Sequence, residues 1–184
     1  MTFDFPGYDL EFVHKSGCKD KSAHLFTLIF KFYSPVTRYY YILRAEYHRE
    51  DVFAIKFYVQ QHSKSNYRYS KITNRKDIGN ILVTCAKVIP HLLNDFPTAS
   101  FGLVASRSVD LKARKAESLQ HNQRFKAYAY FALAKFGTKT FDHIAYDKIS
   151  SYLLINKKCG NILEKEKAII NMFEETYETV PDIV

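Results

Sequence analysis

Apolar and polar residues alternate along the first third of the chain, in three runs at 25–33, 39–47 and 52–61. Alternation with a period of two, in runs rich in aromatic and β-branched residues, is typical of strands that bury one face. A proline-containing turn at 34–37 and a polar loop at 48–51 separate the runs. We therefore predict two successive antiparallel hairpins, with one face of the sheet left for helices to cover.

A helix is predicted over residues 74–95, because apolar side chains recur there at spacings of three and four. The apolar stripe consists of Ile78, Ile81, Leu82, Cys85, Val88, Ile89, Leu92 and Phe96. Asn74 can cap the first turn, and Asp77 lies near the helix N-terminus, where negative charge is favoured. Pro90 removes one backbone hydrogen bond, so we expect the helix to kink or restart there.

The rest of the chain predicts single strands between further helices. The first of these strands is nearly all apolar, which indicates an interior position in the sheet. Gly137 is placed as a left-handed stop for the helix before it. The remaining predicted elements are a strand at 100–105, a helix at 118–136, strands at 141–145 and 150–155, and a helix at 162–177.

This order of elements favours an α+β fold over a doubly wound parallel sheet. We predict an antiparallel sheet built from the N-terminal hairpins and covered by two or three helices. A chain of 184 residues is long enough for one well-packed domain and short for two. A single α+β domain over residues 1–184 is therefore expected.

Composition adds a positive charge to this picture. The chain has 27 Lys and Arg against 19 Asp and Glu, a formal net charge of +8. Such an excess favours nucleic acids, acidic proteins or anionic lipid surfaces as partners. A basic protein that binds no nucleic acid can have the same composition, so charge alone leaves the partner open.

Cysteine usage and the hydrophobic pattern indicate a protein of the reducing cytoplasm. Cys18, Cys85 and Cys159 are isolated and odd in number, so neither a disulfide framework nor a paired metal-binding knuckle is expected. Residues 1–6 lack the basic and apolar pattern of a secretory signal. No run of about 18 apolar residues is present, so we expect no membrane span and no membrane partner.

Residues 72–158 resemble a group of small bacterial α+β domains of unknown function. That group has Asn and Asp ahead of a helix of the form V-L-x-T-V-A, a strand that ends in Gly-Ser, and a second helix that begins with Arg. The matching stretches here are 74–86, 96–97, 103–106, 124–128 and 152–157. This chain has Ala105 where the pattern has Gly, and an insertion at 107–123. The resemblance implies the fold and carries no activity.

The densest basic region of the chain lies in this insertion and at the start of the following helix, and it suits phosphate groups. Aromatic residues there, Phe125 and Tyr128 among them, would provide stacking surfaces for single-stranded nucleic acid. The opposing interpretation makes these aromatics core and the cations a solvated loop. A second basic and aromatic string, at 64–71, would extend the surface or form a polar edge strand. The predicted nucleic-acid-binding residues are Arg68, Arg107, Lys112, Arg114, Lys115, Arg124 and Lys126.

The sequence lacks familiar catalytic motifs, which favours binding over an enzymatic function. Its 7 histidines show no metal-ligand spacing, so no metal and no cofactor are expected. With 6 glycines, the chain has no glycine-rich phosphate loop, and it has no G-x-S-x-G nucleophile motif. The least favoured hypothesis is a metal-independent nuclease that uses His121, Arg124 and Tyr128.

Two kinds of partner remain open at this point. Nucleic acid bound through the basic surface is the leading hypothesis. A protein partner is the alternative, as in a bacterial toxin–antitoxin or phage-defence pair. The acidic C-terminal region, from Glu164 to Asp182, contrasts with the basic middle of the chain and would also allow self-association into a homo-oligomer.

Overall fold

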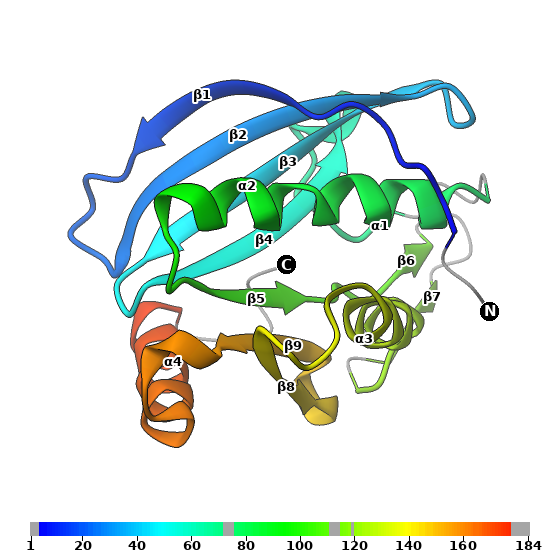
Figure 1. Cartoon of the computed structure of the whole chain (residues 1–184). Coiled ribbons are helices and arrows are strands. Elements are labelled where there is room, and N and C mark those ends of the chain that lie inside the picture. The colour runs from blue at the N-terminus through cyan, green and yellow to red at the C-terminus, as the bar shows by residue number, and fades with distance from the viewer. Residues whose placement is uncertain (1–3, 72–75, 111–114, 119, 178–184) are drawn as a thin grey trace.

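The computed structural model describes residues 4–71, 76–110, 115–118 and 120–177. Their strands form a seven-stranded sheet in the order β1-β2-β3-β4-β5-β9-β8, and a separate two-stranded hairpin (Figure 1). The sheet strands are β1 (Glu11–Gly17), β2 (His24–Ser34), β3 (Tyr39–His48), β4 (Val52–Val59), β5 (Ser100–Val104), β8 (Phe141–Tyr146) and β9 (Ser151–Asn156). The helices are α1 (Ile78–Ala86), α2 (Val88–Asp95), α3 (Gln123–Phe136) and α4 (Ile162–Thr176).

The predicted fold class is confirmed. Strands β1 to β4 pair in antiparallel order, and β5, β9 and β8 continue the sheet with two further antiparallel pairings. Strand β5 pairs with β4 in parallel and with β9 in antiparallel orientation. It is therefore an interior strand of the sheet, as predicted. The edge strand β1 was not predicted.

Pro90 explains why α1 and α2 are two helices. Proline has no N–H to donate to the carbonyl of Ala86, one turn earlier, and its ring crowds that carbonyl. The helix breaks at Lys87 and restarts at Val88, which agrees with the expected restart. In the described part of the chain, Asp77 directly precedes α1. The predicted cap, Asn74, lies outside the described residues.

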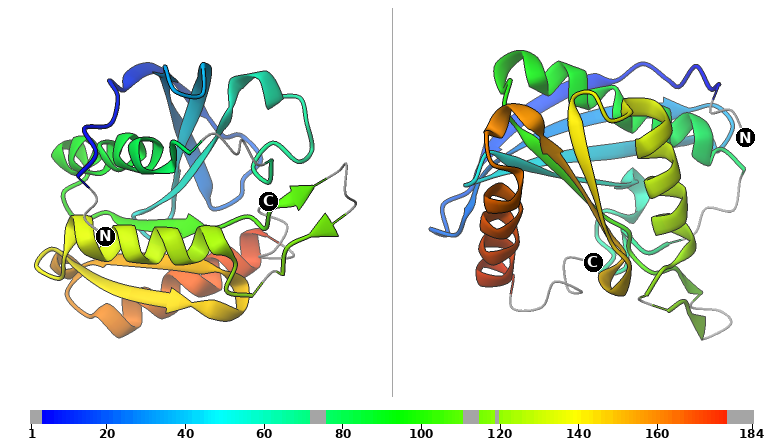
Figure 2. Two further views of the ribbon diagram at one scale, coloured as in Figure 1. Left: turned by 90° about the vertical axis from the view of Figure 1, so that its right-hand side faces the viewer. Right: turned by 60° about the horizontal axis from the view of Figure 1, so that its bottom comes forward.

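One face of the sheet holds most of the core. Alternate residues of the central strands, such as Tyr41, Leu43 and Phe53, are buried toward α1 and α2. Helix α3 packs on the same face over β9, where Phe125 and Leu154 belong to the same core cluster. Figure 2 shows α3 and α4 on opposite sides of β8 and β9.

Helix α4 covers part of the second face. Its buried residues Ile169 and Met172 pack with Leu153 and Ile155 of β9. At the far end of the same face, Tyr33 of β2 and Tyr40 of β3 are 42% and 49% exposed. The second face is therefore closed near β9 and open at the end of β2 and β3 that carries Tyr33 and Tyr40.

Segment 107–123, where the resemblance implies an insertion, contains a short hairpin of β6 (Val109–Asp110) and β7 (Lys115–Ala116), which projects from the body of the molecule (Figure 2). Helix α3 begins at Gln123, later than predicted, because the Asn122 side chain caps it by accepting the Phe125 N–H at 2.8 Å. Gly137 ends α3 at the predicted position with a positive φ of 56°, although its ψ of −164° lies outside the left-handed helical region.

Candidate functional site

The two basic strings of the sequence meet at Arg124. Its guanidinium group donates hydrogen bonds to the backbone carbonyls of Tyr69 and Lys71, the latter at 2.8 Å. The Val109 N–H donates to the carbonyl of Ser70 at 3.3 Å. Segment 67–71 is thereby held against the start of α3 and the base of the β6–β7 hairpin.

A cleft of about 740 Å³ lies where these segments meet. The pairing of β4 with β5 ends at Ile55, and the following residues of β4 form one wall of the cleft. Its other walls come from segment 68–71, the start of α1 and the first turns of α3. The charged and tyrosine side chains that line it are Arg68, Lys71, Lys76, Arg124, Asp77, Tyr41, Tyr58, Tyr69 and Tyr128.

Asp77, the acid in this lining, is buried and accepts hydrogen bonds from uncharged donors. Asp77 is 5% exposed and accepts hydrogen bonds from Tyr8 Oη at 2.8 Å, Asn80 Nδ2 at 2.9 Å and Ser34 Oγ. Four cations line the same cleft as this single carboxylate. The cleft therefore presents a net positive charge, which suits an anionic ligand.

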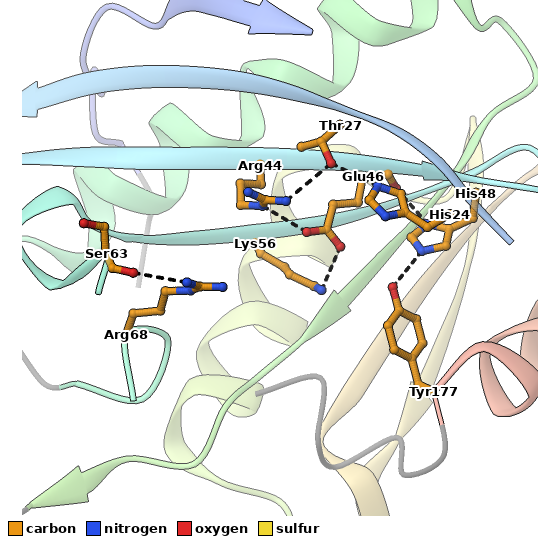
Figure 3. Close-up of polar contacts among 9 residues, drawn as sticks. All are labelled: His24, Thr27, Arg44, Glu46, His48, Lys56, Ser63, Arg68 and Tyr177. Atoms are coloured by element: carbon orange, nitrogen blue, oxygen red, sulfur yellow. Dashed lines mark hydrogen bonds and ion pairs between the residues drawn. The ribbon is translucent and has the colours of Figure 1, made fainter. Parts of the chain in front are cut away.

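Arg68 lies over the rings of two of the tyrosines. The centre of its guanidinium lies 5.0 Å from the Tyr69 ring and 5.4 Å from the Tyr58 ring. Its Nη1 donates to the carbonyl of Ser63 at 3.1 Å (Figure 3). These distances are within the range of cation–π interactions. Arg68, Tyr58 and Tyr69 thus form a fixed cluster in which a cation lies against aromatic rings.

Next to this cluster, on the second face of the sheet, Glu46 lies between two cations (Figure 3). Its carboxylate accepts hydrogen bonds from Arg44 Nε at 3.0 Å and Lys56 Nζ at 2.8 Å. Burial raises the pKa of Glu46, but Lys56 and Arg44 outweigh this effect and hold that pKa below its ordinary value. The three side chains together carry one net positive charge.

His48 connects the same face to the end of α4. Its ring is fully buried, with Nδ1 at 2.9 Å from the carbonyl of Glu46 and Nε2 at 2.8 Å from Tyr177 Oη (Figure 3). Burial, with a smaller contribution from the neighbouring His24, lowers the pKa of His48 to about 4, although the hydrogen bond to the Glu46 carbonyl acts to raise it. At neutral pH His48 is therefore uncharged and joins β3 to Tyr177.

Of the predicted binding residues that the structure describes, some line the cleft and others lie outside it. Arg68 and Arg124 line the cleft, although Arg124 uses two nitrogens on backbone carbonyls. Arg107, Lys115 and Lys126 are exposed and lie on the neighbouring segments rather than among the residues that line the cleft. Two further predicted residues, Lys112 and Arg114, lie outside the described residues.

The residues of the nuclease hypothesis have different surroundings. His121 Nδ1 lies 3.0 Å from Asp147 Oδ1, and both side chains are exposed. Arg124 and Tyr128 line the cleft, and burial raises the pKa of Tyr128 to about 12. Phe125 is core, as the opposing interpretation of this region proposed. Tyr128 is half-buried, packs against the same core cluster and also contributes to a wall of the cleft.

Sequence reasoning missed two of the cleft residues. Lys76 lies just before α1 and outside both basic strings, and Tyr58 follows the alternation of β4 like any strand residue. Neither carries a local signal of function, because the cleft exists only where β4 runs past its β5 partner. Lys71 belongs to the basic string that the sequence does show.

No protein-family model, curated protein or solved structure matches this chain. The resemblance of residues 72–158 to small bacterial domains therefore stays a prediction. Within the part of the chain that the structure describes, no group of three or more His, Cys, Asp or Glu side chains could hold a metal ion. No helix in that part is long and apolar enough to span a membrane. Function is thus inferred from the geometry of the cleft.

Proposed function

We infer that the protein binds nucleic acid through the cleft between β4, segment 68–71 and α3. The observation that carries this proposal is the junction at Arg124, which brings the two basic strings together around one concave surface. Lys71 and Lys76 supply charge for phosphate oxygens. Arg68, held against Tyr58 and Tyr69, supplies a cation beside aromatic rings, a combination that suits backbone and base together.

One exposed cation outside the cleft fits a wider contact. Lys115 lies on the β6–β7 hairpin, and Ser108, next to the base of this hairpin, lines the cleft. A bound strand that leaves the cleft toward the hairpin would meet Lys115. Lys126, two residues after Arg124 on α3, projects from the other side of that helix. The net charge of +8 would also speed the encounter with a polyanion at low salt.

Salt-dependent binding tests this function. Fluorescence anisotropy would follow a labelled single-stranded oligonucleotide across a series of salt concentrations, for the wild type and for a Lys71→Ala/Lys76→Ala variant. We expect log affinity to fall linearly with log salt, with a slope of about 0.7 for each phosphate that a cation neutralises. The variant has two fewer cations to pair with phosphates, so its slope should be smaller by about 1.4.

The control is Lys167→Ala, which removes an exposed lysine of α4, on the other side of the sheet from α3. Its slope and affinity should equal those of the wild type. A wild-type protein that binds neither RNA nor DNA at low salt would overturn the proposal and leave a protein partner as the better hypothesis. Equal slopes for the Lys71→Ala/Lys76→Ala variant and the wild type would show that binding occurs elsewhere.

A further inference from the structure

The open part of the second sheet face carries a row of tyrosines and cations that strand register brings together. Tyr33 of β2 is the direct partner of Tyr40 of β3, and Lys31 is the direct partner of Ile42. Ile42 is in turn the partner of Tyr58 of β4. Direct partners in an antiparallel pair lie on the same face, so these residues form one continuous patch across three strands. We call this patch the tyrosine platform.

The rings at the open end of the tyrosine platform are exposed. Tyr33 and Tyr40 are 42% and 49% exposed, and their ring centroids lie 4.9 Å apart at an interplanar angle of 48°. On the opposite face the neighbouring Tyr41 is 2% exposed and packs against Phe32. Strand alternation alone places polar residues on an open face, so two paired and half-exposed tyrosines there are a departure from that pattern.

Cations accompany the rings at both ends of the platform. Lys31 Nζ lies 5.0 Å from the centre of the Tyr40 ring, and Arg68 stacks on Tyr58. The same face also carries Glu46, which Arg44 and Lys56 more than neutralise. Strand β1 adds an exposed acid there, Glu11, the partner of Lys31. Around the tyrosine platform, the cations Lys31, Arg44, Lys56 and Arg68 outnumber the acids Glu11 and Glu46, so this part of the face is positive.

The tyrosine platform is continuous with the cleft. Tyr58 belongs to the platform and also lines the cleft, together with Arg68 and with Tyr69, whose ring lies 5.3 Å from that of Tyr58. Tyr33 on β2 and Tyr58 on β4 are two strands apart, about 10 Å, and are offset by two residues along the strands, about 7 Å, so they are separated by about 12 Å. That span suits two or three unpaired bases on a sheet surface.

We propose that the tyrosine platform binds the bases of single-stranded nucleic acid while the cleft binds its backbone. Unpaired bases stack on Tyr33 and Tyr40, and the strand passes Lys31 and Arg68 on its way to the cleft. A duplex keeps its bases stacked inside the helix and offers no free ring face to the platform. The protein therefore selects single strands. This inference rests on the proposed function and adds the class of nucleic acid that is bound.

The test compares a Tyr33→Ala/Tyr40→Ala variant with the wild type on single-stranded RNA and DNA of about 12 nucleotides and on a duplex of the same length. We expect the single strands to bind at least about tenfold more weakly. The duplex affinity and the salt slope should stay unchanged, because every cation that pairs with a phosphate is still present. A Tyr33→Phe/Tyr40→Phe variant should retain wild-type affinity, since phenylalanine stacks equally well. Circular dichroism of each variant verifies the fold.

Tyr130→Ala is the matched control, because Tyr130 of α3 is also 49% exposed and lies outside the tyrosine platform. This variant should bind like the wild type. If wild-type binding and its salt slope are present but the Tyr33→Ala/Tyr40→Ala variant binds single strands normally, the platform is overturned and the cleft proposal stands. Sedimentation velocity tests whether a second copy of the chain, rather than nucleic acid, occupies this face. Wild-type dimers that the same variant dissociates, with unchanged nucleic-acid affinity, would assign the platform to a second copy of the chain and overturn the proposal.

Discussion

His48 shows how burial changes the chemistry of a single residue. It is fully buried with both ring nitrogens bonded, and its pKa is lowered to about 4. In the unfolded chain its pKa returns to about 6.5, so the unfolded state binds the proton more readily between these values. Stability from neutral His48 is complete above the unfolded pKa and is lost as pH falls toward the folded pKa. We expect the free energy of unfolding to fall by about 3 kcal/mol across this window.

Urea unfolding at several pH values between 7 and 4.5 measures this effect. His48→Gln should flatten the pH dependence in that range, because it removes the titrating ring. His14→Gln, a change at an exposed histidine of β1, should leave the dependence as it is. Parallel curves for the wild type and His48→Gln would contradict the assignment.

Single residues also mark the limit of sequence reasoning about the site. The basic strings that contain Arg68 and Arg124 are visible in the sequence, and both residues line the cleft. The bonds from Arg124 to the Tyr69 and Lys71 carbonyls are not visible, because they join segments that are distant along the chain. Asp77 was placed correctly near a helix start, but its partners Tyr8 and Ser34 come from other segments.

At the scale of elements, alternation and spacing predicted the strands and helices whose burial is one-sided. The three N-terminal runs match β2, β3 and β4, because each buries alternate residues under α1 and α2. Strand β1 escaped prediction because every residue in it is exposed and leaves no hydrophobic pattern. The β6–β7 hairpin escaped for a similar reason, since each of its strands has only two residues.

Helix starts depend on caps, and two asparagines of this chain form a natural comparison. Asn122, which is 2% exposed, caps α3 and also donates to the Ala105 carbonyl at 2.7 Å. Asn161 is exposed and caps α4 by accepting the Glu164 N–H at 3.2 Å. We expect Asn122→Ala to lower the free energy of unfolding by about 2 kcal/mol, since it removes a cap and leaves a buried carbonyl without its donor.

Asn161→Ala removes a cap alone and should cost about 1 kcal/mol. Chemical denaturation of the two variants under one set of conditions measures the difference. Equal losses would mean that the bond to the Ala105 carbonyl adds nothing to the stability of the fold.

At the scale of the whole molecule, the sheet joins both halves of the chain. Strands β1 to β4 come from the N-terminal third, and β9 and β8 from the C-terminal half, with β5 between them. The prediction of one domain then has a direct test. Far-ultraviolet circular dichroism and tyrosine emission should give coincident unfolding curves, as in a two-state transition. The chain has 14 Tyr and no Trp, so the emission reports on tyrosines throughout the sheet. Two separate transitions would divide the chain into more than one cooperative unit.

The parallel pairing of β4 with β5 also bears on the order in which the chain folds. Hairpins such as β2–β3, β3–β4 and β8–β9 join segments that are close in sequence, whereas β4 and β5 meet only after α1 and α2 have closed a long loop. The entropy of loop closure must be overcome before such distant contacts contribute, and non-local pairing slows folding. We therefore expect the β4–β5 junction to form late. Since the cleft begins where that junction ends, the binding surface would be complete only when folding itself is complete.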